Sequence, residues 1–186
     1  MKNLSAATLG ALLLIGHQAS AQMALFDGSN LDAWEVLGDA NWTVSGDVVE
    51  ATSGGGHLVT KNSYSDFVLT AEFWVDDPAN SGIFIRCASP EEISPGTCYE
   101  VNIYDQRADQ TYRTGSIVNF APPQAQISAG GQWNTYEIRA EGTRLLVTLN
   151  GTVTVDIEDS SYTEGRLTLQ YGSGTVRFRN VQIQPL

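Results

Sequence analysis

Cysteine and histidine are scarce in this chain, and their scarcity limits the chemistry open to it. The 186 residues include two cysteines and two histidines. Structural and catalytic zinc sites draw most of their ligands from these two residue types. The acidic residues, in turn, do not follow the spacing of a calcium-binding loop. We therefore expect no cofactor and no zinc site, and a calcium ion on surface acidic residues is the one alternative left open.

Basic residues are also few, with ten Lys and Arg against 21 Asp and Glu and a formal charge of −11. Proteins that bind nucleic acid carry clusters of Lys and Arg that neutralise phosphates. Such clusters are missing from this sequence, so we expect no nucleic-acid partner. Neutral or weakly polar ligands fit the composition better.

Long apolar runs are absent except near the start, where Ala6–Ile15 follows the single charge of Lys2. This run of about 10 residues is too short for a membrane-spanning helix. It is followed by Ala19-Ser20-Ala21, a small-x-small pattern that signal peptidase cuts. We predict a signal peptide over residues 1–21 and a single domain over 22–186. The protein would be exported to the periplasm or the extracellular space, with no membrane attachment after cleavage.

The two cysteines, Cys87 and Cys98, are expected to form a disulfide, as a lone pair does in most exported proteins. Two free thiols or a metal-binding pair are the alternatives. The segment between them, with Pro90, Pro95 and Gly96, predicts a loop closed at its base by the bridge.

The rest of the chain is a series of short strand-like runs separated by turn residues, with no convincing amphipathic helix. The clearest run is Phe67–Val75, in which apolar residues alternate with Val68, Thr70, Glu72 and Trp74. Asn150-Gly151 between two such runs predicts a type I′ hairpin. About ten strands of this kind predict an all-β antiparallel sandwich or jelly roll.

Splitting each run into two faces gives one aliphatic face and one mixed face. If the strands share one sheet, the mixed face collects Glu72, Arg86, Glu100, Asn102 and Gln170 together with Trp74, Phe84 and Tyr104. Aromatic rings beside carboxylates and amides suit a sugar. An ordinary solvent face with cross-strand ion pairs, such as Arg86 with Glu100, explains the same pattern. His57, after three glycines, is either a general base in a loop or an inert surface residue.

The order of several motifs resembles the DUF1080 family, also called the 3-keto-disaccharide hydrolase domain. The most specific match is Asn80-Ser81-Gly82-Ile83-Phe84-Ile85-Arg86. It is preceded by Leu25-Phe26-Asp27-Gly28 and followed by Tyr99-Glu100-Val101-Asn102-Ile103. The resemblance covers nearly all of residues 24–186. It implies a concanavalin A-like jelly roll with a concave ligand face.

The resemblance also implies action on glycosides whose sugar carries a ketone at carbon 3. A base removes the proton at carbon 2, and the enolate then expels the group on carbon 1. Glu100 is the candidate base or acid, and Arg86 the candidate donor to the enolate oxygen. We expect both to project from neighbouring strands into one hollow. The residues expected to position the ligand are Lys61, Glu72, Asn102, Asp105, Arg113 and Gln170, with Trp74, Tyr104 and His57 as further contacts.

Other functions stay open on the sequence alone. Glu72 and Glu100, if they share a face, suit an ordinary two-carboxylate glycosidase. The same fold also hosts non-catalytic carbohydrate-binding modules, and it can serve as a structural domain without a small ligand. If the protein does act on keto-glycosides, a sugar 3-oxidoreductase that installs the ketone is the expected pathway partner.

Overall fold

The computed structural model describes residues 21–89 and 91–186, so the predicted signal peptide lies almost wholly outside the described residues. Over these ranges the chain forms thirteen strands and one short 3₁₀ turn, η1 (Gln110–Tyr112). The strands are β1 (Met23–Phe26), β2 (Trp34–Gly38), β3 (Thr43–Ser45), β4 (Val48–Ala51), β5 (Gly56–Tyr64), β6 (Phe67–Val75), β7 (Asn80–Cys87), β8 (Tyr99–Ile103), β9 (Trp133–Glu141), β10 (Arg144–Leu149), β11 (Thr152–Glu158), β12 (Gly165–Ser173) and β13 (Val176–Pro185).

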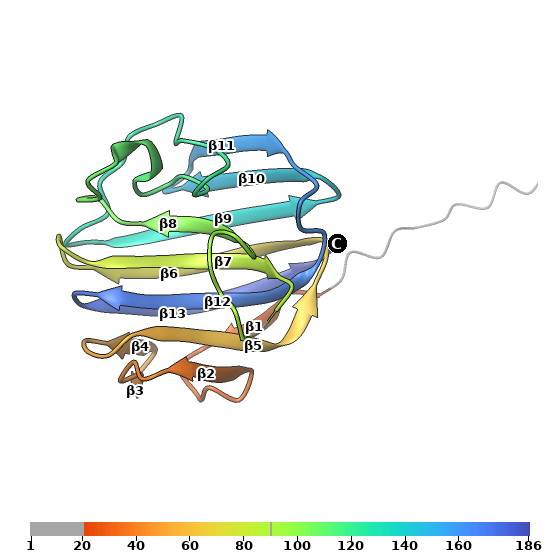
Figure 1. Cartoon of the computed structure of the whole chain (residues 1–186). Helices are drawn as coiled ribbons and strands as arrows, with labels where there is room; N and C mark the ends of the chain where they lie inside the picture. Colours follow the sequence, from red (N-terminus) through yellow and green to blue (C-terminus); the bar gives the residue numbers. More distant parts are fainter. Residues whose placement is uncertain (1–20, 90) are drawn as a thin grey trace, which may run out of the picture.

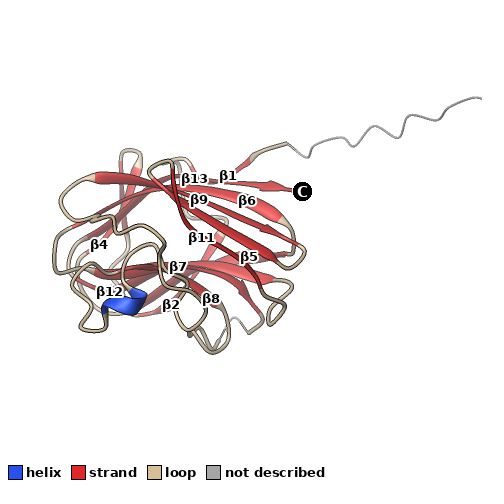
Figure 2. Cartoon of the chain, turned by 90° about the horizontal axis from the view of Figure 1, so that it is seen from above, coloured by secondary structure: helices blue, strands red, loops and turns tan. Residues whose placement is uncertain are grey.

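The strands form two antiparallel sheets that pack face to face (Figures 1 and 2). The larger sheet has the order β11-β10-β9-β6-β13-β4-β3, with β1 pairing with β13. The smaller sheet has the order β2-β5-β12-β7-β8 and lies in front in Figure 1. The predicted β-sandwich is thus confirmed. No described residue belongs to a helix long and apolar enough to cross a membrane.

The core lies between the sheets and follows the alternation of the strands. In β6, every second residue from Phe67 to Val75 is buried, while the residues between them are half-buried. Phe73 stacks on Tyr136 of the neighbouring β9 with ring centroids 4.9 Å apart. Burying each large apolar side chain stabilises the fold by about 1.5–3 kcal/mol, which is why this face is aliphatic or aromatic throughout.

Two local predictions are confirmed. Asn150 and Gly151 connect β10 and β11 with φ values of +51° and +78°, as a type I′ turn requires. Cys87, the last residue of β7, forms a disulfide with Cys98, which directly precedes β8.

The premise that the mixed-face residues share one sheet is wrong. β6 belongs to the larger sheet, whereas β7, β8 and β12 belong to the smaller one. The short connection at residues 76–79 therefore crosses from one layer to the other. Alternation distinguishes the two faces of a strand but does not say in which sheet the strand lies. Glu72 and Trp74 consequently lie on the opposite outer surface of the sandwich from Glu100.

Candidate functional site

The outer face of the smaller sheet brings together several of the predicted residues. Leu58, Leu169, Ile83 and Val101 point into the core, so their strand neighbours point outward. Strand pairing aligns these neighbours in two rows that run from β5 to β8. The first row is His57, Gln170, Gly82 and Asn102, and the second is Val59, Thr168, Phe84 and Glu100.

Glu100 is the acidic residue of this face. The residue is only 5% exposed, and burial raises the pKa of its carboxyl to about 7, although the nearby charge of Arg107 opposes this shift. No described residue donates a hydrogen bond to the carboxylate. A Cβ placed on Gly82 would lie 3.3 Å from Glu100 Oε1, so the carboxyl group rests against the bare backbone of β7. Such a group can both take and give a proton near neutral pH.

Three buried polar atoms without a described partner lie near Gly82 or act on Glu100. Asn102 Oδ1 and Gln170 Oε1, from the two strands that flank β7, are buried and accept no hydrogen bond from described residues. The Asn102 amide is held in place by donating from Nδ2 to the carbonyl of Tyr112. Arg107 Nε is a buried donor without a described acceptor. Buried groups without partners are costly, and ligand hydroxyls are able to satisfy them.

His57 belongs to the same face, although the three preceding glycines suggested a loop. It is the second residue of β5 and is 8% exposed. Its Nδ1 lies 3.0 Å from the Thr168 hydroxyl, and its ring meets Phe84 edge-on at 5.1 Å. Burial lowers the pKa of His57 to about 4, so the imidazole is neutral at pH 7. Two strand spacings, roughly 10 Å, separate β5 from the β7 backbone against which Glu100 rests.

The disulfide loop borders this face at the Phe84 row. Phe84 packs with Cys87 and Cys98 in a small apolar cluster, and Ile93 from the loop packs against it. The hydroxyl of Tyr162 donates to the carbonyl of Gly96, tying the loop to the β11–β12 connection. The loop crosses in front of the smaller sheet in Figure 1. The predicted closed loop is therefore part of the surroundings of Glu100.

Arg86 does not share a hollow with Glu100, and this prediction is wrong. The Arg86 side chain is fully buried, and its φ of +54° marks a break in the regular strand. Its guanidinium group is held by the carbonyls of Ser65 (2.9 Å), Gly142 (2.9 Å) and Tyr162 (3.2 Å), and by Asp66 Oδ1 at 3.1 Å. These partners lie in the turns at one end of the sandwich. Arg86 joins those turns, and its burial there keeps it from a substrate oxygen.

Glu72 and Trp74 are not part of this site. On the outer face of the larger sheet, the Glu72 carboxylate accepts from Asn180 Nδ2 (2.8 Å) and from Arg179 Nε (2.8 Å), and these hydrogen bonds lower its pKa. Arg177 lies over the ring of Trp74 at 4.5 Å. The two-carboxylate pairing of Glu72 with Glu100 is therefore wrong.

Four further predicted residues lie at the margins of this outer face. Asp105 Oδ2 accepts from the backbone N–H groups of Ala129 (2.7 Å) and Gly130 (3.1 Å), and Arg113 lies 3.5 Å from Asp105 Oδ1. These two side chains thus hold a loop. Tyr104 donates its backbone N–H to the hydroxyl of Thr114, and Lys61 is exposed in β5 beyond the His57 row.

Gly82, Thr168 and Arg107 belong to the site but were not among the predicted site residues. Gly82 lies inside the most specific motif, and Thr168 alternates with Gln170 in β12, so both could have been found. Arg107 lies in an irregular segment where no periodicity predicts its direction.

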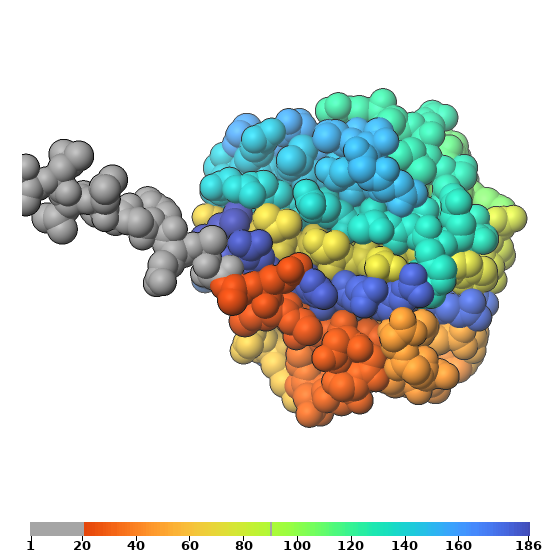
Figure 3. Space-filling model, turned by 180° about the vertical axis from the view of Figure 1, so that it is seen from behind, coloured from red at the N-terminus to blue at the C-terminus, as the bar shows by residue number. Residues whose placement is uncertain are grey.

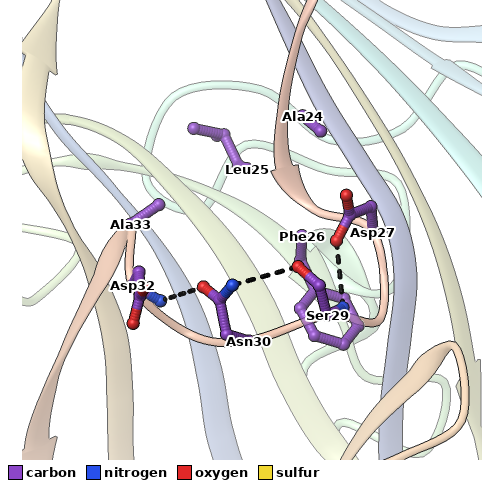
Figure 4. A pocket seen from close by; sticks show the side chains of 8 residues that line it. All are labelled: Ala24, Leu25, Phe26, Asp27, Ser29, Asn30, Asp32 and Ala33. Carbon is purple, nitrogen blue, oxygen red and sulfur yellow. Dashed lines mark hydrogen bonds between the residues drawn. The ribbon is translucent and has the colours of Figure 1, made fainter.

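Other parts of the described structure are weaker candidates for a functional site. A cavity of about 240 Å³ beside the β1–β2 connection is lined by apolar and polar residues in equal number (Figure 4). Its polar side chains bond within their own loop, such as Asp27 to the N–H of Ser29 and Asn30 to the N–H of Asp32. The described residues contain no group of three or more His, Cys, Asp or Glu side chains arranged to hold a metal ion.

Fold and site together define a jelly-roll β-sandwich with a buried carboxyl group on the outer face of one sheet. The family model of the 3-keto-alpha-glucoside-1,2-lyase-like domain matches residues 22–184, so the chain belongs to this family. No curated protein matches the chain.

Solved structures share the fold at low sequence identity. Two candidate glycosyl hydrolases from Parabacteroides distasonis are 20% and 23% identical, with TM-scores of 0.80 and 0.74. Both comparisons cover 89% of this chain, and they cover 94% and 100% of the other chains. The carbohydrate-binding module CBM66 from Bacillus subtilis is 18% identical with a TM-score of 0.65, over 82% of this chain and 95% of the module. These likenesses confirm the jelly-roll fold.

Proposed function

We propose that this protein is an exported enzyme that cleaves 3-keto-glycosides by elimination, with Glu100 as the proton-transferring residue. The observation that carries the proposal is the Glu100 carboxyl, which is buried, free of hydrogen bonds from described residues and has a pKa of about 7. Perturbed carboxyl groups of this kind are concentrated at catalytic sites. Family membership supplies the substrate class.

The reaction uses the ketone to acidify the neighbouring C–H bond. Ionised Glu100 takes the proton from carbon 2, and its electron pair forms the enolate of the 3-ketone. The enolate collapses, the bond from carbon 1 to its oxygen breaks, and the leaving alkoxide takes a proton from a water molecule. The hydroxide left from that water adds to carbon 1 of the new double bond, while carbon 2 receives a proton. Glu100 can return the proton it took, because its pKa lies near the working pH.

Other residues of the face position the sugar in this proposal. The unpaired oxygens of Asn102 and Gln170 accept from sugar hydroxyls on either side of Gly82. Arg107, whose charge acts on Glu100, takes the role of enolate donor that was predicted for Arg86. Neutral His57, about two strands away, hydrogen-bonds the leaving group.

The chemistry of the substrate and the disulfide indicate the preceding reaction and the compartment in which the enzyme would act. The substrate must come from a reaction that oxidises the 3-hydroxyl of a glycoside, which is the work of a sugar 3-oxidoreductase. The disulfide between Cys87 and Cys98 supports an oxidising compartment and hence export.

The test is incubation of the purified protein with a 3-keto-disaccharide and with the unoxidised parent, followed by mass spectrometry of the products. We expect cleavage of the keto sugar alone. Glu100→Gln should lower kcat by roughly 10²-fold or more, the usual effect of losing a general base. Glu137→Gln, the same change at an exposed position of β9 on the other sheet, should leave kcat unchanged.

Failure to detect any product from the keto sugar at high protein concentration would refute the proposed enzymatic activity. Sugar binding without turnover would instead support a non-catalytic carbohydrate-binding module, the class to which the Bacillus subtilis neighbour CBM66 belongs by name.

A further inference from the structure

The outer face of the larger sheet, which Figure 3 shows, carries a concave site. A cavity of about 310 Å³ lies there, within the size range of small-molecule sites. Its lining comes from β3, β4, β9 and β13 and consists of Thr43, Ser45, Val48, Glu50, Trp133 and Arg177. In Figure 3 these strands are the orange β3 and β4, the cyan β9 and the dark blue β13, with yellow β6 between the last two.

Strand pairing places aromatic and charged residues in one row across this face. Trp133 of β9 pairs with Trp74 of β6, Trp74 with Arg177 of β13, Arg177 with Glu50 of β4, and Glu50 with Thr43 of β3. The row thus runs from two indole rings through an ion pair to a hydroxyl. Neighbours in such a row stand side by side on the same face of the sheet.

Both arginines beside the tryptophans are fixed and neutralised. Arg179 lies over the Trp133 ring at 4.0 Å, while Glu72 Oε2 accepts from its Nε at 2.8 Å and lies 2.7 Å from its Nη2. Arg177 bonds to Glu50 Oε2 through Nε at 2.5 Å and covers Trp74. Guanidinium groups held in this way orient the indole rings. Because a carboxylate balances each positive charge, the face has no net attraction for a polyanion.

We propose that this cavity binds one unit of a neutral saccharide. Arg179 occupies one face of the Trp133 ring, and the ring also borders the cavity, so it offers an apolar surface to the C–H groups of a sugar. Glu50, Thr43 and Ser45 supply acceptors and hydroxyls for the sugar hydroxyls. This composition fits a neutral sugar better than an anion, which would compete with Glu50 for Arg177.

The site is separate from Glu100, which lies on the outer face of the other sheet, and it does not depend on the proposed reaction. Binding at this cavity holds the protein on a glycan while the Glu100 face of the smaller sheet stays free for substrate. It also gives Glu72 and Trp74 a role, since Glu72 holds Arg179 against the lining residue Trp133 and Trp74 packs against the lining residue Arg177.

The test is a titration of the ¹⁵N-labelled protein with maltose, cellobiose, lactose and sucrose at millimolar concentrations, followed by NMR. We expect at least one of these sugars to shift the indole N–H of Trp133 and the amides of β3 and β4. Trp133→Ala should weaken this binding by roughly tenfold. Trp133→Phe, which keeps a ring against Arg179, should bind at an intermediate level and guards against a folding defect.

Two control variants show whether binding belongs to this cavity rather than to the wider sheet surface or to the Glu100 face. Arg139→Ala removes an arginine on the same outer face that pairs with Glu141, away from the cavity, and should leave binding unchanged. Glu100→Gln should keep the Trp133 shifts even where it abolishes turnover. The proposal is overturned if no sugar shifts Trp133, if shifts are confined to the Glu100 face, or if folded Trp133→Ala binds as tightly as the parent.

Discussion

Replacing Glu100 by glutamine should make the protein more stable at alkaline pH, because the native state bears the cost of a buried carboxylate. The carboxyl has an ordinary pKa of 4.5 and a folded-state pKa of about 7. Between these values the folded chain keeps the proton that the unfolded chain has lost. The free energy of unfolding therefore falls as pH rises through this window. At about 1.4 kcal/mol per pKa unit, the loss is about 3 kcal/mol by pH 8.

The assay is urea unfolding of the parent and of Glu100→Gln from pH 4 to pH 8.5, with the disulfide intact. Subtracting the two curves removes the contribution of every other titrating group that the substitution leaves alone. Near pH 4 the two proteins should differ little, because Glu100 is protonated in both states. Above pH 7 the variant should be more stable by about 3 kcal/mol. A difference that stays constant across the range would refute the burial argument.

Glu72→Gln is the matched control, since its effect on the free energy of unfolding at neutral pH should have the opposite sign. Hydrogen bonds from Asn180 and Arg179 lower the pKa of Glu72, so its carboxylate stabilises the folded state. That contribution is present above the ordinary pKa of 4.5 and is lost as pH falls through the lower folded-state value. The variant should thus be less stable than the parent at neutral pH and should approach it in acid.

Three further outcomes follow from the same contacts. Arg86→Ala should lower the free energy of unfolding by about 3–5 kcal/mol, because Asp66 and three carbonyls lose their donor; a loss below about 1 kcal/mol in urea unfolding would contradict this. The His57 imidazole, with a pKa of about 4, should show no NMR titration between pH 5.5 and 8, and a midpoint near 6.5 would disprove its burial. Replacing Cys87 and Cys98 by serine should cost about 3 kcal/mol for a loop closed at a separation of 11 residues, and an unchanged urea midpoint would contradict that.

Alternation predicted well wherever a strand is regular. The buried face of β6, the core residues of β7 and β8, and the outward direction of Glu100, Asn102 and Gln170 all follow from a period of two. The Asn150-Gly151 hairpin follows from the positive φ that this dipeptide tolerates. Such features are local, and a single stretch of sequence contains all the information that they need.

Assignment of strands to sheets is not local, and here the prediction failed. β6 and β7 are joined by a connection short enough for a hairpin, yet they lie in different layers. β6 pairs instead with β9 and β13, which are distant in the sequence. The faces predicted for Glu72 and Glu100 were each correct as outward faces, but they are the outward faces of opposite sheets.

Arg86 shows a second limit, because a single backbone angle redirects its side chain. Regular alternation would place it beside Phe84, facing outward with Glu100. Instead, φ is +54° at Arg86, and pairing with β12 shifts register between Phe84 and Cys87. Positive φ costs a non-glycine residue about 1–3 kcal/mol, so the bonds to Asp66 and three turn carbonyls must outweigh this strain. An arginine that ends a strand motif can therefore belong to the scaffold, and only its contacts distinguish that role from catalysis.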